Sequence, residues 1–314
     1  MLSVIRRTTV LALIVVSSSL VGIEHADARE YPWYKYENAH FEVYSNGKKR
    51  KVLKMIEELE NFRAAAVQVL AFEIPEDAVK TQVIVPRNRG ALQDIVDNET
   101  VAAFFTVIDD VPYMVSPVGT TRRMSAEMLR HEYIHVLQRY SPHVFPKWYL
   151  EGFAELMSST HFTKRGKKFT VGDPTERPFF GGPMVAWNTL VSDDFSPHGI
   201  NDLALGSNAY YQSWLLTHYV TVGDQFARYP QLSRYLGRYA AGEPSLEAFE
   251  AEFGKSPQEV GEWLMENYNR KITYYQFMFK PGIQDHDFSR TEIPVEEIAP
   301  TLDRLKQLWV SSRQ

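Results

Sequence analysis

Two histidines and a glutamate lie within the run His131-Glu132-Tyr133-Ile134-His135. In an α-helix, four residues turn the chain by slightly more than one revolution and advance it by about 6 Å, so both histidines point to one side. Two imidazoles placed in this way can bind one metal ion, and Glu132 can reach a water molecule beside that ion. The run predicts metal-assisted hydrolysis with Glu132 as the general base. The alternative is an ordinary helix in which both histidines only pack or form hydrogen bonds.

A hydrolytic site of this kind needs a third protein ligand, most often a glutamate, and an open fourth position. The run 148–157 predicts a second helix with Pro146 near its start. Glu151 and Glu155 share one face of that helix, and Glu151 is the candidate third ligand. It follows His135 by enough residues for a turn to bring the second helix back across the first. Glu155 is expected to accept a hydrogen bond from the outer ring nitrogen of a ligand histidine. A solvated glutamate is the alternative for Glu155.

Gly152 lies in the middle of this second predicted helix. A glycine there costs about 1 kcal/mol of helix stability relative to alanine. Its presence predicts that the backbone of a neighbouring element approaches the helix closely.

The segments HEYIH and PKWYLEGFAEL resemble the gluzincin metallopeptidases, most closely the bacterial peptidase MA-like family. In that family, a Pro-Trp-x-x-Glu-Gly-x-Ala-Glu segment follows HExxH, and its first glutamate is the third zinc ligand. This chain departs from the pattern in one respect, because Lys147 separates Pro146 from Trp148. The resemblance implies one Zn²⁺ ion per chain with three ligands, His131, His135 and Glu151.

A further part of the resemblance is Tyr210-Tyr211-Gln212-Ser213, which is similar to the family's Tyr-x-Gln-Ser helix. It implies that Tyr210 stabilises the negative charge that develops on the attacked carbonyl oxygen. Tyr211 is an alternative for that role, and both rings could instead belong to a helix core. The chain has no Gly-x-Met-Glu-Asn element, which captures a substrate amino terminus in gluzincin aminopeptidases. The resemblance therefore favours an endopeptidase acting on peptides or proteins.

Two other functions use the same sequence features. One is a zinc hydrolase of a non-protein amide in the cell envelope. The other is a non-catalytic binding protein on a zincin fold, since membership of an enzyme family does not guarantee activity.

Residues 1–28 predict a secretory signal peptide, with Arg6 and Arg7 before the apolar stretch 8–22 and a small-x-small cleavage site at 26–28. The apolar stretch is shorter than the roughly 20 residues that span a bilayer. We expect an exported bacterial protein, periplasmic or secreted, without stable membrane insertion beyond the leader. An uncleaved N-terminal anchor is the alternative.

The net charge of −5 gives no basic surplus for binding nucleic acid. The chain has no cysteine and therefore no disulfide. Among the other histidines, His143 and His161 are expected at the surface. His218 is expected to be packed in the core, although it could face the metal.

Periodicity predicts strands at 41–44, 81–85, 101–107 and 111–116, and helices at 52–70 and 87–97. By the resemblance, 111–116 is the edge strand of the sheet. We expect an α+β, zincin-like fold whose mixed N-terminal sheet precedes the active-site helix. The predicted parts are the signal peptide, an N-terminal subdomain at 29–160, a mainly helical C-terminal subdomain at 161–280 and a tail at 281–314 with a possible helix.

Overall fold

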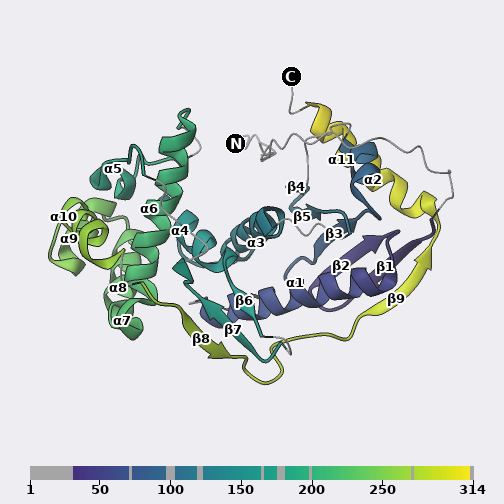
Figure 1. Ribbon diagram of the computed structural model, residues 1–314, viewed down its shortest axis with the longest axis horizontal. Helices are drawn as coiled ribbons and strands as arrows, with labels where there is room; N and C mark the ends of the chain where they lie inside the picture. Colours follow the sequence, from purple (N-terminus) through teal and green to yellow (C-terminus); the bar gives the residue numbers. More distant parts are fainter. Residues whose placement is uncertain are drawn as a thin grey trace, which may run out of the picture. The chain divides into compact units, whose positions relative to one another are not determined.

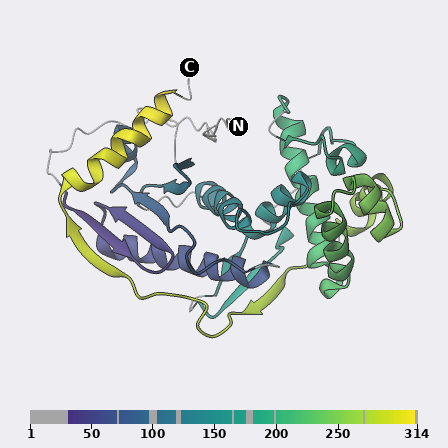
Figure 2. The same cartoon turned by 180° about the vertical axis from the view of Figure 1, so that it is seen from behind.

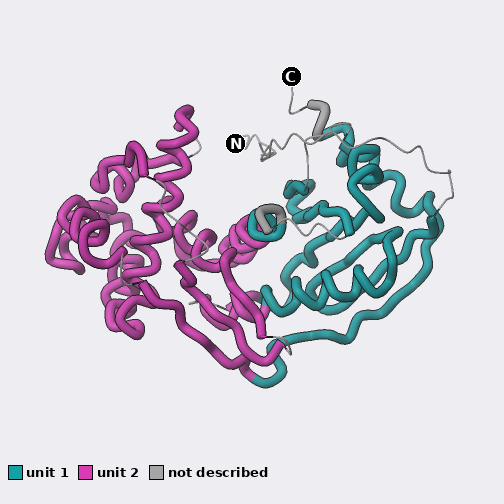
Figure 3. Tube along the Cα trace, viewed as in Figure 1, with its two compact units in different colours: residues 1–63, 75–129, 281–314 teal, residues 64–74, 130–280 magenta. Residues whose placement is uncertain are grey.

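The computed structural model describes residues 31–70, 73–96, 103–118, 123–163, 166–174, 181–197, 200–269 and 272–311. The predicted signal peptide lies outside these residues. Within them the chain is α+β, with a mixed six-stranded sheet, a three-stranded sheet and the helices α1 to α11 (Figure 1). The chain divides into two compact units (Figure 3). Unit 1 comprises residues 1–63, 75–129 and 281–314, and unit 2 comprises residues 64–74 and 130–280.

Unit 1 holds the six-stranded sheet, in the order β4-β5-β3-β2-β1-β9. Strand β2 is parallel to β3, and β3 is parallel to β5, whereas the other neighbours are antiparallel. The bounds of the six strands are β1 (Trp33–Glu37), β2 (Phe41–Ser45), β3 (Thr81–Val85), β4 (Phe104–Ile108), β5 (Val111–Val115) and β9 (Ser289–Ile293). Five strands of this mixed sheet precede the HExxH helix, as predicted, and β9 joins the sheet from near the end of the chain.

The prediction that 111–116 forms the sheet edge is wrong, because β5 pairs with both β3 and β4. Asp109 and Asp110 connect β4 to β5 with φ angles of 49° and 66°. Two left-handed residues form the tight turn that suits a hairpin, so β4 folds back onto the open side of β5. Strand β4 is consequently the edge, and β9 is the opposite edge.

The helices of unit 1 are α1 (Lys49–Val69), whose last six residues belong to unit 2, α2 (Arg89–Val96) and α11 (Val295–Ser311). The first two begin and end within three residues of the predicted helices 52–70 and 87–97, and α11 lies in the tail for which a possible helix was expected. Buried residues of α2 and α11 form one core with the sheet, including Leu92, Leu305, Ile84 and Val115. Helix α1 runs along β1 and β2 (Figures 1 and 2).

Unit 2 is mainly helical, and it carries every candidate site residue. Helix α3 (Arg123–Gln138) enters it at Arg130, and α4 (Lys147–Ser158) follows. The later elements are α5 (Trp187–Val191), α6 (Leu203–Thr221), α7 (Gly223–Phe226), α8 (Tyr229–Ala240), α9 (Ser245–Phe253), α10 (Pro257–Trp263) and a π-helix (Leu264–Tyr268). The small sheet has β7 (Lys168–Val171) between β6 (His161–Phe162) and β8 (Tyr275–Met278).

Helices α4 and α6 pack closely at Gly152. A Cβ atom at this position would lie 2.2 Å from Thr217 Oγ1 and 2.3 Å from the carbonyl oxygen of Ser213. The predicted close approach of a neighbouring backbone is confirmed, and the neighbour is α6. This contact fixes the helix that carries Glu151 against the helix that carries Tyr210.

No helix in the described ranges is both long enough and apolar enough to cross a bilayer.

Candidate metal centre

Helices α3 and α4 bring three side chains to one point. His131 and His135 lie one turn apart in α3, and Glu151 lies in α4 after a connection that ends at Pro146. Their side chains are 12%, 28% and 10% exposed, respectively. The one candidate ligand atom of each residue lies within 4.8 Å of the other two, so this largely buried group could bind a metal ion.

The spacing of these atoms matches a tetrahedral ion. Nε2 of His131 lies 3.1 Å from Nε2 of His135, and Oε2 of Glu151 lies 3.2 Å and 3.4 Å from the same two nitrogens. A metal such as zinc, bound at about 2.0–2.2 Å, holds its ligand atoms about 3.4 Å apart at the corners of a tetrahedron. The residues therefore fit a small divalent cation with little rearrangement.

The outer nitrogen of each imidazole faces an acceptor. Nδ1 of His131 lies 3.0 Å from Oε1 of Glu155. This is an ion-pair distance, but the angle between the two groups does not meet that of a regular hydrogen bond. Nδ1 of His135 lies 2.9 Å from Oε1 of Gln138. The amide nitrogen of Gln138 donates to the carbonyl oxygen of Leu150 at 3.3 Å, which fixes the amide with its oxygen towards His135.

These outer contacts decide which ring nitrogens carry protons. A carboxylate and an amide oxygen both accept, so each neutral imidazole keeps its proton on Nδ1. In this neutral form, which metal binding requires, both Nε2 lone pairs point at each other and at a carboxylate oxygen of Glu151. Three acceptors converging on one point favour a cation between them.

Charge around the group supports the same conclusion. Burial by itself lowers the pKa of His131, but the carboxylates of Glu151 and Glu155 together raise this pKa to about 10. Without a metal, both ring nitrogens of His131 therefore carry a proton at neutral pH. A metal ion can replace that proton in the same field of negative charge.

Tyr210 is the tyrosine of α6 that lies beside this group. Its ring centroid is 6.1 Å from that of His131. Burial raises the pKa of Tyr210, and the nearby carboxylates of Glu151, Glu155 and Glu132 raise it further, so its phenol remains a hydrogen-bond donor. The hydroxyl of Tyr211, by contrast, donates to Oδ1 of Asn269 at 2.5 Å. The structure thus places Tyr210 beside His131, whereas the hydroxyl of Tyr211 is bonded to Asn269.

The other three histidines considered from the sequence, all among the described residues, do not belong to the metal group. His143 and His161 are exposed, as predicted. His218 is fully buried, with Nδ1 2.9 Å from the Tyr268 hydroxyl and Nε2 3.2 Å from the carbonyl oxygen of Gly172. Burial lowers the pKa of His218 to about 4, although backbone carbonyls oppose that shift. The prediction of a packed core histidine is confirmed.

Sequence reasoning missed two polar contributions. Gln138 follows His135 by three residues on the same helix face, and this spacing was the available signal. Asn208 donates to the carbonyl oxygens of Gly181 and Pro183 at 3.2 Å and 2.7 Å. Gln212 forms hydrogen bonds with both the N–H and the carbonyl oxygen of Val185. Asn208 and Gln212 together therefore fix the loop 181–185 to α6, the helix that carries Tyr210.

No protein-family model matches the sequence, and no curated protein matches it. The function of this group must therefore be inferred from its own geometry and chemistry.

Proposed function

We propose that this chain is a zinc-dependent metallopeptidase, with Zn²⁺ bound by His131, His135 and Glu151. The observation that carries the proposal is that the Nε2 atoms of both histidines point towards Glu151. Glu155 and Gln138 favour this orientation, because each lies against the Nδ1 atom of one histidine. Two imidazoles and one carboxylate are the usual protein ligands of a hydrolytic zinc site, which keeps its fourth position open. The spacing of 3.1 to 3.4 Å between the three atoms supports a tetrahedral ion.

The proposed chemistry assigns a role to each nearby side chain. Bound zinc supplies a Lewis acid that polarises a carbonyl and lowers the pKa of water. Glu132 takes a proton from the attacking water and delivers it to the leaving amine. The Tyr210 hydroxyl donates to the developing negative oxygen, an interaction that is stronger in the transition state than in the ground state. Glu155 orients His131, and Gln138 orients His135.

We further propose that the protein is a gluzincin endopeptidase related to the bacterial peptidase MA-like family, on a zincin-like fold. Support comes from the order of the elements, since five strands of the mixed sheet precede the HExxH helix and a second helix brings in Glu151. Its substrates would be peptides or proteins outside the cytoplasm, because residues 1–28 resemble an export signal.

The test compares residues 29–314 of the natural sequence with the same chain carrying Glu132→Gln. Zinc is measured by elemental analysis, and turnover is measured as cleavage of a denatured, fluorescently labelled protein. We expect both proteins to bind one zinc ion, and the variant to lose at least about 100-fold in turnover, because a positioned base contributes about 10²–10⁴-fold.

Glu250→Gln is the matched control, since Glu250 is an exposed glutamate of α9. It should leave both zinc content and turnover unchanged. Full zinc occupancy without cleavage in the natural sequence would refute the peptidase assignment. Equal cleavage by the Glu132→Gln variant would refute the role of Glu132.

A further inference from the structure

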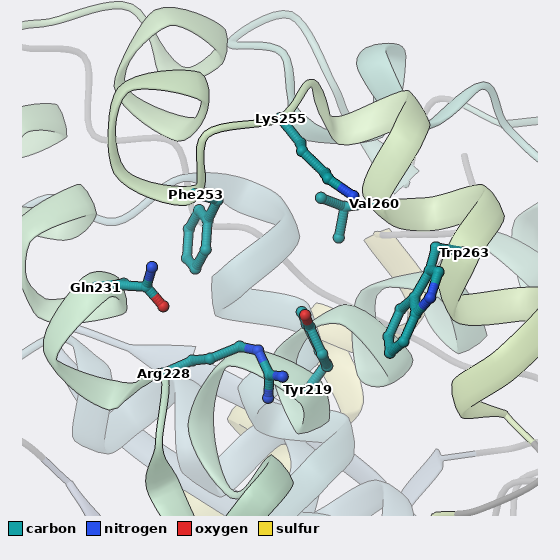
Figure 4. A pocket seen from close by; sticks show the side chains of 7 residues that line it. All are labelled: Tyr219, Arg228, Gln231, Phe253, Lys255, Val260 and Trp263. Carbon is teal, nitrogen blue, oxygen red and sulfur yellow. The ribbon is translucent and has the colours of Figure 1, made fainter.

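A hollow separate from the metal group lies in unit 2 at the C-terminal end of α6, between α8, α9 and α10. Figure 4 shows the side chains around it, which are Tyr219, Arg228, Gln231, Phe253, Lys255, Val260 and Trp263. Its volume is about 290 Å³. Tyr219 follows Tyr210 by nine residues, which is about 13 Å along the helix. None of the lining residues belongs to the metal group, so this is a separate feature of the same unit.

The lining is positively charged. It contains Arg228 and Lys255, and none of the described residues that line it is acidic. The guanidinium of Arg228 lies over the ring of Tyr219 at 3.8 Å from the centroid, and its Nη2 contacts Asp224 at 2.6 Å. These two contacts hold Arg228 in one orientation, whereas the exposed Lys255 can move.

One nitrogen of Arg228 is unsatisfied. Its Nη1 is buried and has no hydrogen-bond partner in the described part of the chain. Buried polar groups of this kind are rare and call for an explanation. A carboxylate that enters the hollow would lie beside this guanidinium and the ammonium group of Lys255, and arginine is well suited to bind carboxylates.

The backbone beside Arg228 is also unusual. Asp224, Gln225 and Phe226 have φ angles of 49°, 56° and 66°, so three consecutive residues other than glycine are left-handed. Such conformations are costly and cluster at functional sites. Here the turn places Asp224 against the guanidinium, which aligns Arg228 along the hollow.

The rest of the lining suits an apolar group and an amide. Trp263 is 41% exposed and forms an apolar wall with Phe253 and Val260. The amide nitrogen of Gln231 donates to the carbonyl oxygen of Glu252 at 3.2 Å, which leaves its Oε1 as an acceptor for an N–H group. The hollow therefore offers partners for a carboxylate, an amide N–H and an apolar side chain.

We propose that this hollow binds an N-acylated apolar amino acid, either free or as the carboxy-terminal residue of a peptide. That residue carries the three groups just named on one Cα atom. The volume is at the lower end of the range of about 300–1,000 Å³ typical of small-molecule sites, so it suits one residue. This site does not depend on zinc or on the proposed peptidase activity.

The test is calorimetric titration of residues 29–314, first treated with EDTA so that no bound metal can hydrolyse the ligand. The probes are N-acetyl-L-phenylalanine, its uncharged amide, inorganic phosphate and an acetylated pentapeptide that ends in phenylalanine. We expect the acid to bind at least about tenfold more tightly than the amide, because a charge-assisted hydrogen bond is lost. Binding of the pentapeptide at least as tight as that of the single residue would assign the site to peptide ends, and weaker binding would assign it to the free residue.

Three variants locate the binding. Lys255→Gln and Trp263→Leu should each weaken binding of the acid several-fold, and Lys255 is exposed, so its replacement leaves folding intact. Lys54→Gln is the control, because Lys54 is exposed and lies in unit 1. It should bind the acid like the natural sequence.

Four outcomes would overturn the proposal. They are absence of binding, equal binding of acid and amide, phosphate binding as tight as that of the acid, and unchanged binding in both pocket variants. Repeating the titration with zinc separates the two sites. Binding that requires zinc would place the ligand at the metal group and refute the second site, whereas binding that persists with EDTA supports it even if the protein proves to have no peptidase activity.

Discussion

Replacing Gly152 by alanine tests how the candidate metal centre is built. Gly152 follows Glu151 in α4, and it lies against both a side chain and the backbone of α6. An added methyl group would meet Thr217 Oγ1 and the carbonyl oxygen of Ser213 at 2.2 Å and 2.3 Å. The Ser213 carbonyl belongs to the backbone of α6, so the helices themselves must move.

The size of the effect follows from these distances. Ordinary contact begins at 3.4 Å, so the distance to the Ser213 oxygen must grow by about 1.1 Å (3.4 minus 2.3). Overpacking of this kind typically costs about 1–3 kcal/mol, and two close contacts favour the upper value. Alanine returns about 1 kcal/mol through its better helix propensity. We expect a net loss of about 2 kcal/mol in the free energy of unfolding.

Gly237→Ala supplies the matched control. Gly237 lies inside α8 and is exposed, and a methyl group added there would meet no described atom within 4 Å. The same substitution there should gain about 1 kcal/mol, because only helix propensity changes. The two variants should therefore differ by about 3 kcal/mol with opposite signs.

Urea unfolding of the EDTA-treated proteins, followed by circular dichroism, measures this difference. Zinc affinity gives a second measurement, since a shift of α4 moves Glu151 away from the two Nε2 atoms, and we expect Gly152→Ala alone to weaken it. A Gly152→Ala protein as stable as Gly237→Ala would refute the close approach of α4 and α6 at Gly152.

Three further predictions concern individual side chains. Glu155→Gln should lower zinc affinity by about 10–100-fold in competition with a chromophoric chelator, and unchanged affinity would exclude its role in orienting the ligand. Tyr210→Phe should lower kcat by about 10²–10³-fold, whereas Tyr211→Phe should leave it almost unchanged, and the reverse result would exchange their roles. His218→Gln should flatten the pH dependence of stability. The unfolded chain binds a proton on His218 near pH 6.5, but the native state binds it only near pH 4, so stability falls by about 3 kcal/mol as the pH drops between these values. Urea unfolding from pH 7.5 to 4 should show that loss in the natural sequence and in the exposed control His143→Gln, and an equal loss in His218→Gln would exclude His218 as its source.

The parts of the fold that depend on local sequence could be predicted. Strand β3 and helix α1 follow hydrophobic periodicity, and β2 extends the predicted strand by one residue. The α+β class and the mixed sheet follow from the order of these elements. The pair Asp109 and Asp110 also suits a turn by residue type, because aspartate tolerates left-handed φ angles.

The parts that depend on pairing across long sequence distances could not be predicted. Strand β9 pairs with β1 across more than 240 residues, and four of its five residues are exposed, so its sequence has no apolar alternation. Strand β4 is the edge strand because β3 pairs with one side of β5, which leaves only the other side for β4. Periodicity specifies which face of a strand is buried, and it does not specify the neighbours of that strand.

In the candidate site, too, the local sequence predicts one part of the geometry, and packing between helices decides the rest. The HExxH spacing places His131 and His135 on one side of a helix, but it leaves either ring nitrogen of each able to turn inward. Acceptors outside the pair settle that choice, and they come from different sources: Glu155 from α4, and Gln138 from the next turn of α3, held by the carbonyl oxygen of Leu150. Helix α4 therefore contributes to both imidazoles as well as supplying Glu151. A cation site at this position depends on the packing of α4 against α3 as much as on the motif, which is why contacts that keep α4 in place should affect metal binding as strongly as some residues beside the ion.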